Sequence, residues 1–221
     1  MLKTVIFDMD GVIIDSEAQH AKASLNTFKE LGVDTDLDYC KSFTGSSSKK
    51  MAETAIKDFS LDITTNALLD KLNLAKKKLH EKEGYIPVEG VDALIKRLYK
   101  DGVQLAIASS SSPKEIETVV KKLGIKKYFE KLVSASSVAN PKPSPDTFLL
   151  ALEKLGASPE DTVIIEDSTF GVKAAKAANV ACIGFINPNS GNQNLNDADV
   201  LIESFDGIDK TFIENTLLRS Q

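Results

Sequence analysis

The stretch TVIFDMDGVIIDSE, residues 4–17, contains a short apolar run that ends at a pair of acidic residues. The run at 5–7 is typical of a buried strand, and Asp8 and Asp10 follow it, separated by one residue. Alternate side chains of an extended chain point the same way, so the two carboxylates can face one spot. Carboxylates that close repel each other unless a cation lies between them or one carries a proton. The pair therefore suits Mg²⁺ binding or general acid catalysis.

Two other interpretations of this pair come from its composition. Asp and Gly are ordinary turn residues, so the stretch can also be a solvated turn. A calcium-binding EF-hand loop starts in a similar way, but it needs a helix in front and a glycine at its sixth position. Here a strand pattern precedes the pair, and Gly11 is the fourth residue counted from Asp8. Motifs elsewhere in the chain are needed to distinguish a solvated turn from a functional site.

Short apolar runs alternate with helical patterns along most of the chain. Runs rich in β-branched residues cover 4–7, 103–108, 131–135, 162–166, 180–185 and 199–202. The helical patterns between them cover 88–102, 112–124, 144–156 and 168–180. This alternation predicts an α/β fold with a doubly wound, mostly parallel, Rossmann-like sheet core.

Several helix ends carry their own signals. Ser112 is followed by Pro113 and then by Glu115, which is typical of a capping box with proline in the first turn. Ser144, also followed by proline, predicts a second cap of this kind. C-terminal glycines are expected at Gly102, Gly124 and Gly156.

The interval 17–86 breaks the alternation, because helical patterns fill it and no convincing strand does. A helical block between the first and second strands predicts an inserted all-α domain, with junctions near 15–17 and 84–87. We therefore expect a core made of 1–16 and 87–221 and an inserted domain made of 17–86.

Three further polar groups follow strand-like runs. Ser109 and Ser110 stand at the entrance to a helix, where hydroxyl and backbone N–H groups suit a phosphate oxygen. Lys142 stands between two prolines that stiffen its backbone, and an exposed lysine on a rigid loop is the alternative. Glu166 and Asp167 form a second acidic pair, for which a helix cap is the alternative. Open parallel sheets bind ligands at the carboxyl ends of their strands, so we expect these groups to converge on one crevice.

Composition excludes several classes of protein. The chain has 221 residues, 42% of them hydrophobic, with 27 basic and 32 acidic residues and a net charge of -5. It lacks a long basic run, which argues against a nucleic-acid partner, and it lacks the ~20 apolar residues of a membrane span. Cys40 and Cys182 have no metal-binding spacing and suit a reducing compartment. We expect a cytoplasmic monomer.

Taken together, these motifs resemble the haloacid dehalogenase superfamily of phosphotransferases, and within it the branch of β-phosphoglucomutase and small sugar-phosphate phosphatases. FDMDGV at 7–12 is similar to the first family motif, Ser109 to the second, Lys142 to the third and EDS at 166–168 to the fourth. The resemblance covers nearly the whole chain, and the helical block 17–86 resembles the cap of this family.

The resemblance implies an Mg²⁺-dependent enzyme that transfers a phosphoryl group of a small phosphorylated substrate. Asp8 would attack phosphorus and form an aspartyl-phosphate, while Asp10 would protonate the leaving oxygen and later deprotonate water. Mg²⁺ would be held by Asp8, Asp167 and the backbone carbonyl of Asp10, with Glu166 as a further ligand or as a partner of the ligands. The residues that would bind the transferring group are Ser109, Ser110 and Lys142. Haloacid dehalogenation itself uses no Mg²⁺ and lacks the second aspartate, so we do not expect it.

The cap bears on the choice between phosphatase and mutase. In β-phosphoglucomutases a cap loop carries a lysine and an arginine, which would grip the second phosphate of a bisphosphate; Thr44 and Ser48 stand in their places here, and Lys49 follows. Ser112-Pro113 also replaces a serine-lysine pair of those mutases. We therefore expect hydrolysis of a sugar phosphate or similar metabolite, with β-phosphoglucomutase-type isomerisation as the alternative. His20 resembles a histidine that links cap closure to the acid/base aspartate, and a surface histidine is its alternative.

A phosphoaccepting signalling domain is a rival from another class, because receiver domains also combine acidic residues, a hydroxyl, a lysine and Mg²⁺. Receivers carry the phosphoacceptor on a middle strand, whereas here the candidate nucleophile follows the first strand and a large insertion comes next. An inactive binding protein is disfavoured because no motif residue is missing.

Overall fold

The core of the molecule is a parallel sheet. The computed structural model describes residues 1–43 and 48–219. The strands are β1 (Thr4–Phe7), β2 (Gln104–Ser109), β3 (Lys131–Ser134), β4 (Thr162–Glu166), β5 (Ala181–Phe185) and β6 (Val200–Ile202). They form one six-stranded sheet in the order β3-β2-β1-β4-β5-β6, and every neighbouring pair is parallel. The predicted doubly wound, Rossmann-like fold is thus confirmed.

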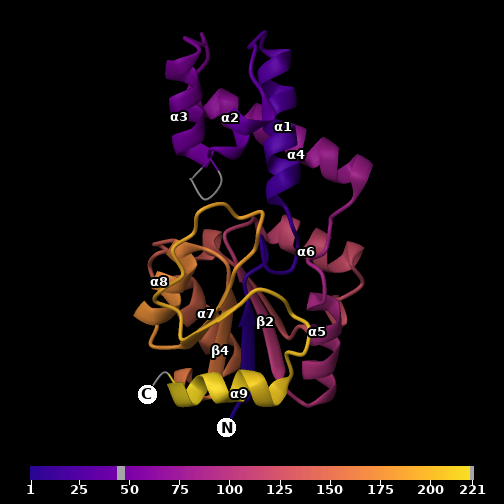
Figure 1. Ribbon diagram of the computed structural model, residues 1–221, viewed down its shortest axis with the longest axis vertical. Helices are drawn as coiled ribbons and strands as arrows, with labels where there is room; N and C mark the ends of the chain where they lie inside the picture. Colours follow the sequence, from indigo (N-terminus) through magenta and orange to yellow (C-terminus); the bar gives the residue numbers. More distant parts are fainter. Residues whose placement is uncertain (44–47, 220–221) are drawn as a thin grey trace.

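Helices cover both faces of this sheet (Figure 1). Side chains of β1 alternate between the faces, so that Val5 and Phe7 join one buried cluster and Ile6 joins the other. The helices that pack on the first cluster are α5 (Val91–Lys100), α6 (Pro113–Lys122) and α9 (Lys210–Arg219). Those on the second are α7 (Asp146–Leu155) and α8 (Thr169–Ala177).

The position of β1 in the sheet determines where a ligand can bind. β1 pairs with β2 on one side and with β4 on the other, so the strand order reverses there. In open α/β sheets such a reversal leaves a crevice outside the carboxyl ends of the strands. The chain from Asp8 to Gly11 leaves β1 at this point, and β2 and β4 end beside it.

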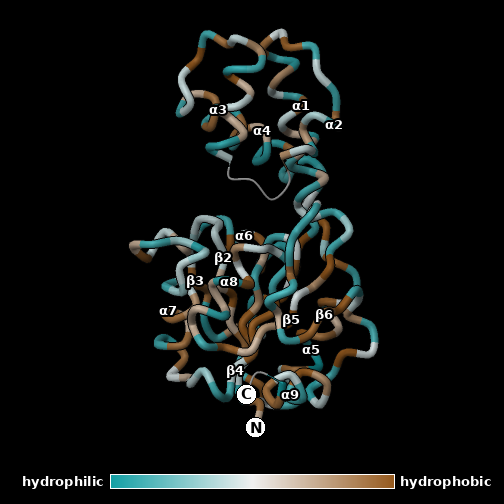
Figure 2. Tube along the Cα trace, turned by 60° about the vertical axis from the view of Figure 1, so that its left-hand side comes forward, coloured by the Kyte–Doolittle hydropathy of each residue, from teal (hydrophilic) through white to brown (hydrophobic). Residues whose placement is uncertain are grey.

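Four helices form a separate cluster above the core, as the tube in Figure 2 shows. They are α1 (Glu17–Glu30), α2 (Leu37–Lys41), α3 (Ser48–Asp58) and α4 (Thr65–Glu83). This helical cluster has a buried centre of its own, which includes Phe28, Leu68 and Leu72. The two segments that join it to the core run side by side, because Asp15 N donates to Ile86 O at 2.8 Å.

The helix ends confirm most of the sequence signals and overturn one. Ser112 caps α6, with its hydroxyl accepting from Glu115 N at 3.3 Å. The three expected C-terminal glycines have positive φ, at Gly102 (73°), Gly124 (69°) and Gly156 (64°).

The predicted cap at Ser144 is wrong: its hydroxyl donates to Asp146 Oδ1 at 2.6 Å, and Pro145 occupies the N-cap of α7. The Ser144 hydroxyl gives its proton to a charged acceptor, which makes a stronger hydrogen bond than a neutral partner does.

Helix α9 had no counterpart in the sequence patterns that we used. It starts after Asp209, whose Oδ1 accepts from Phe212 N at 2.8 Å and satisfies one backbone donor of the first turn. None of the helices in the described ranges combines the length and the apolar character that crossing a membrane requires.

Candidate active site

Lys142 lies at the centre of a buried ionic cluster. Its Nζ is 2.5 Å from Asp8 Oδ1, 2.7 Å from Glu166 Oε1 and 3.1 Å from the main-chain oxygen of Ala108. Its side chain is only 6% exposed, and the ammonium group lies 4.6 Å from the ring centre of Phe148. The exposed lysine that we considered as the alternative is therefore not what the structure shows. All three protons of the ammonium group have acceptors inside the protein.

Glu166 holds this lysine through one oxygen and the start of α8 through the other. Oε2 accepts from the backbone N–H of Asp167 and Ser168 and from the Ser168 hydroxyl, at 2.9 to 3.0 Å. Gly171 makes room for the carboxylate, because a Cβ at that position would lie 1.8 Å from Glu166 Oε1. Glu166 is thus fully occupied by protein donors, which favours the second of its two expected roles, a partner of the ligands.

Asp167 lies against the turn that follows β1. Gly11 has φ +86°, and a Cβ there would lie 1.9 Å from Asp167 Oδ2. The missing side chain therefore serves two needs, a left-handed backbone and a close approach. The hydroxyl of Ser190 donates to Asp167 Oδ2. Asp8 and Asp167 are both buried, and the Asp8 carboxylate is one of the charges that raise the pKa of Asp167.

Asp10 is held differently from Asp8. Its Oδ1 accepts from the Ser16 hydroxyl at 2.9 Å, and its Oδ2 accepts from the Ser111 hydroxyl at 2.8 Å. It is half-buried, whereas Asp8 is buried beside the lysine. The two carboxylates of the first pair thus have separate environments, which is the arrangement that gives two acids different roles.

Ser109 ends β2 with a fully buried side chain. Its Oγ accepts from Ser111 N at 3.0 Å, so the hydroxyl proton remains available for a ligand oxygen. Ser134, opposite Ser109 in the register of β2 and β3, donates to Ser111 O at 2.7 Å and braces this turn. Ser110 is exposed and makes no side-chain hydrogen bond to the turn among the described residues.

The buried charges do not balance. Asp8 and Glu166 contact Lys142, and Asp167, the residue after Glu166, adds a third buried carboxylate. Burial raises the pKa of Asp8 and of Asp167, and neighbouring carboxylates raise both further. Burial alone would lower the pKa of Lys142, but Asp8 and Glu166 outweigh it and raise that pKa above its ordinary value.

This excess of negative charge fits a divalent cation. Within residues 1–43 and 48–219, no hydrogen bond occupies Asp8 Oδ2 or Asp167 Oδ1. The same residues contain no group of three or more His, Cys, Asp or Glu side chains arranged to hold a metal. The donor set that fits is therefore two carboxylate oxygens together with main-chain oxygen and water, which are ligands that Mg²⁺ accepts.

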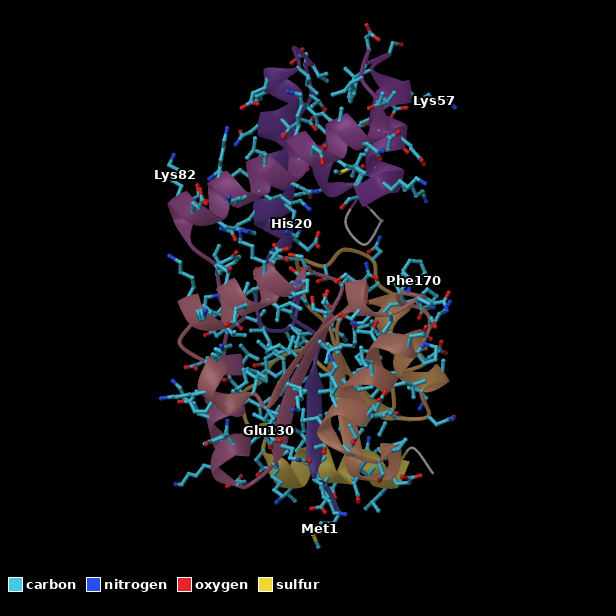
Figure 3. All side chains as sticks on the ribbon, turned by 180° about the vertical axis from the view of Figure 1, so that it is seen from behind. Met1, His20, Lys57, Lys82, Glu130 and Phe170 are labelled. Atoms are coloured by element: carbon cyan, nitrogen blue, oxygen red, sulfur yellow. The ribbon has the colours of Figure 1, made fainter. Side chains whose placement is uncertain are left out.

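The expected cap residues lie outside this cluster. His20 is on α1, where the helical cluster meets the core (Figure 3), and its Nδ1 is 3.8 Å from Glu17 Oε1. Ser48 is exposed at the start of α3, and Lys49 is 72% exposed and 3.9 Å from Glu53. Thr44 lies outside the described residues.

Comparison with known proteins identifies the family. Residues 5–185 match the family described as haloacid dehalogenase-like hydrolase. The chain belongs to the haloacid dehalogenase-like hydrolases.

Named relatives in this family include both phosphatases and mutases. The chain is 31% identical over 180 residues to the fructose-1-phosphate phosphatase YqaB of Escherichia coli, covering 81% of this chain and 94% of YqaB. It is 29% identical over 190 residues to the β-phosphoglucomutase of Bacillus subtilis, covering 83% of each chain. The crystal structure of CbbY from Rhodobacter sphaeroides in complex with phosphate superimposes with a TM-score of 0.83 at 26% identity, covering 97% of this chain and 100% of that one.

Several residues that touch the acidic groups of this haloacid dehalogenase-like hydrolase were not found from its sequence. Ser16 and Ser111 bind Asp10, and Ser190 binds Asp167. Ser111 stands in the sequence between Ser110 and Ser112, and Ser16 follows the first motif closely. Phe170, 52% exposed on the first turn of α8, lies at the edge of the core that faces the helical cluster (Figure 3).

Proposed function

We propose that this protein is an Mg²⁺-dependent phosphatase that hydrolyses a small phosphorylated metabolite, such as a sugar phosphate, through an aspartyl-phosphate on Asp8. The observation that carries the proposal is the contact of Asp8 Oδ1 with the buried Lys142, 2.5 Å away, at the reversal of the strand order. Lys142 holds the Asp8 carboxylate in a fixed orientation in the crevice, where this carboxylate can act as the nucleophile. The family's phosphatases and mutases support this chemistry class.

The first step transfers the phosphoryl group to Asp8. A bond forms between a carboxylate oxygen of Asp8 and phosphorus while the bond from phosphorus to the ester oxygen breaks. Asp10, held by two hydroxyl donors, gives the leaving oxygen its proton. The Ser109 hydroxyl can donate to a transferring oxygen, and the positive charge of Lys142 next to Asp8 offsets the negative charge that develops during the transfer.

The second step returns the enzyme to its starting state. Asp10, now ionised, takes a proton from water, and the resulting nucleophile displaces phosphate from Asp8. The same carboxylate thus acts as acid in one step and base in the next. Mg²⁺, bound by Asp8, Asp167 and the main-chain oxygen of Asp10, would supply charge neutralisation between the anionic nucleophile and the phosphate.

Helical residues 17–86 act, in this proposal, as a cap over the site. The cap also favours water over a hydroxyl of a phosphorylated sugar as the acceptor of the phosphoryl group. A mutase has to grip the non-reacting phosphate of a bisphosphate, and Lys49 is exposed and directed to Glu53 within its own helix. β-Phosphoglucomutase-type isomerisation remains the second candidate, and the relative in Bacillus subtilis is the observation that supports it.

A phosphoaccepting signalling role has less support. Receiver-type sheets of the flavodoxin kind have the strand order 2-1-3-4-5, whereas this sheet has the order 3-2-1-4-5-6. We further propose that the enzyme works as a cytoplasmic monomer. Its net charge of -5 and the lack of a long basic run in its sequence favour a small diffusible substrate over nucleic acid.

The test is a panel of phosphorylated sugars assayed for phosphate release with Mg²⁺ and with excess EDTA. We expect many turnovers with Mg²⁺ and none with EDTA, and a signalling domain would accept only one phosphoryl group. In a parallel assay, β-glucose 1-phosphate and its bisphosphate are tested for glucose 6-phosphate. Efficient isomerisation with little free phosphate would establish the mutase instead.

A further inference from the structure

The loop of residues 186–199, between β5 and β6, reaches the candidate active site. The Asn187 side chain donates through Nδ2 to Gly11 O at 2.8 Å, and the Ser190 hydroxyl donates to Asp167 Oδ2. Asn187 is 7% exposed and Ser190 is 5% exposed. Two buried polar side chains of this loop therefore bind two separate parts of the site, the turn after β1 and the carboxylate after β4.

A tight turn joins these two side chains. Ser190 N donates to Asn187 O at 3.1 Å, and Asn189 N donates to Asn187 Oδ1 at 2.8 Å. The Asn189 side chain adds a hydrogen bond to Asp15 Oδ2 at 2.6 Å. Because hydrogen bonds within the turn connect Asn187 to Asn189 and Ser190, we expect a displacement of Asn187 to move Ser190 as well.

The far end of the loop is anchored to α8. Gln193 Oε1 accepts from Thr169 N at 3.0 Å, and the Thr169 hydroxyl accepts from Asn194 N at 2.7 Å. A cavity of about 150 Å³ lies between the loop and Asp167, with Asn187 and Gln193 in its wall. The loop is thus held over Asp167 by directed polar contacts and not by close packing alone.

We propose that Ser190 and Asn187 are positioning residues of the Mg²⁺ site: Ser190 occupies Oδ2 of Asp167 so that Oδ1 is left for the cation, and Asn187 fixes the Gly11 turn against the same carboxylate. This inference rests on the proposed function, because it assigns residues to the cation that function requires.

The geometry explains why two contacts are needed. Asp8 and Asp167 come from different strands, and only a fixed distance between them gives a cation two carboxylate ligands at once. The Gly11 turn and Asp167 already approach so closely that a single Cβ would not fit between them.

The experiment measures Mg²⁺ binding directly, in the full chain stripped of metal. Isothermal titration with MgCl₂ is carried out on the wild type, Ser190→Ala and Asn187→Ala, with Asn192→Ala as the control. Asn192 is an exposed residue of the same loop and makes no contact with the site among the described residues. Groups that orient metal ligands typically contribute about 10- to 100-fold in affinity, so we expect Kd for Mg²⁺ to rise about tenfold or more in the first two variants and not in the control.

Two further readouts separate positioning from general stability. The Tm of the metal-free protein should stay near that of the wild type in Ser190→Ala, while the rise in Tm on adding MgCl₂ becomes smaller. In phosphate-release assays, the Mg²⁺ concentration for half-maximal rate should rise, and kcat at saturating Mg²⁺ should be kept. An unchanged Kd in Ser190→Ala, or a lower kcat at saturating Mg²⁺ with unchanged Kd, would overturn the inference while leaving the proposed function intact. A wild type that binds no Mg²⁺ would overturn both.

Discussion

Glu166 Oε1 lies 2.7 Å from Lys142 Nζ, and Glu166 Oε2 accepts three hydrogen bonds from the start of α8. Such a carboxylate is a holder of the lysine and not a free metal ligand. We predict that Glu166→Gln lowers kcat by about tenfold or more, as the loss of an orienting partner usually does, while Kd for Mg²⁺ changes little. Steady-state kinetics and isothermal titration check the two parts.

Glu160→Gln is the matched control, because Glu160 is an exposed glutamate just before β4 and its side chain makes no hydrogen bond or ion pair among the described residues. It should behave like the wild type in both measurements. A Kd for Mg²⁺ that rises in Glu166→Gln as much as in Asp167→Ala would show that Glu166 is a direct ligand after all.

The first acidic pair should divide its work according to its two environments. Asp8 contacts the buried lysine and Asp10 contacts two hydroxyls, so each substitution removes a different function. Asp8→Asn should abolish turnover, because no nucleophile remains. Asp10→Asn should slow both formation and breakdown of the aspartyl-phosphate, with kcat lowered by about 10²–10⁴-fold.

Mass spectrometry of the protein after mixing with substrate locates the phosphoryl group. We expect it on residue 8 in the wild type and in Asp10→Asn, where slow breakdown should increase its yield. A phosphoryl group trapped on any other side chain would contradict the assignment of Asp8.

Among the cap residues expected to take part in function, His20 lies nearest in sequence to Asp10. It is 22% exposed, its Nδ1 is 3.8 Å from Glu17 Oε1, and its ring lies 6.1 Å from that of His80. We predict that His20→Ala lowers kcat by more than about threefold, since positioned proton-handling groups contribute at least that much. Asn26→Ala, an exposed change on the same helix, should leave kcat unchanged. Equal kcat values in the two variants would make His20 an ordinary surface histidine.

The sheet could be predicted from the sequence because its central strands, β1, β2, β4 and β5, are buried and mostly apolar runs. Burial on both faces requires such runs, and the observed strands begin and end within one residue of the predicted ones. The convergence of Asp8, Ser109 and Asp167 followed from a general rule, since parallel strands bring their carboxyl ends to one edge. Lys142 needed the family resemblance, because nothing in a proline-flanked lysine shows that it is buried.

The contacts to the acidic groups could not be predicted in the same way. Ser16 and Ser111 reach Asp10 only because the chain folds back after Gly11 and because β2 lies next to β1. Ser190 contacts Asp167 from an irregular loop, and the sequence of this loop has no hydrophobic periodicity from which its conformation could be predicted. Hydrogen bonds between distant loops depend on tertiary structure, so they cannot be predicted from the local sequence.

Gly11 offers the sharpest test of how closely the site is built. Gly11→Ala places a Cβ 1.9 Å from Asp167 Oδ2 and also forces a left-handed backbone on alanine, at φ +86°. The control is Gly102→Ala, which has φ +73° but nothing within 4 Å of the new Cβ. Both variants should lose about 1–2 kcal/mol of stability from the backbone, as an L-residue in this region does.

Only Gly11→Ala should also lose function, because its Cβ has to displace the Asp167 carboxylate. A misplacement of about 1 Å near reacting atoms costs about 10²-fold in rate, so we expect kcat/KM to fall by about a hundredfold in Gly11→Ala and to stay near wild type in Gly102→Ala. Urea unfolding measures the shared loss of stability, and phosphate release measures the difference. If both variants lost activity in proportion to their stability, the close approach of Gly11 and Asp167 would have no part in catalysis. If Gly11→Ala alone lost activity while binding Mg²⁺ as tightly as the wild type, the displaced group would be the Asp10 side chain and not the Asp167 carboxylate.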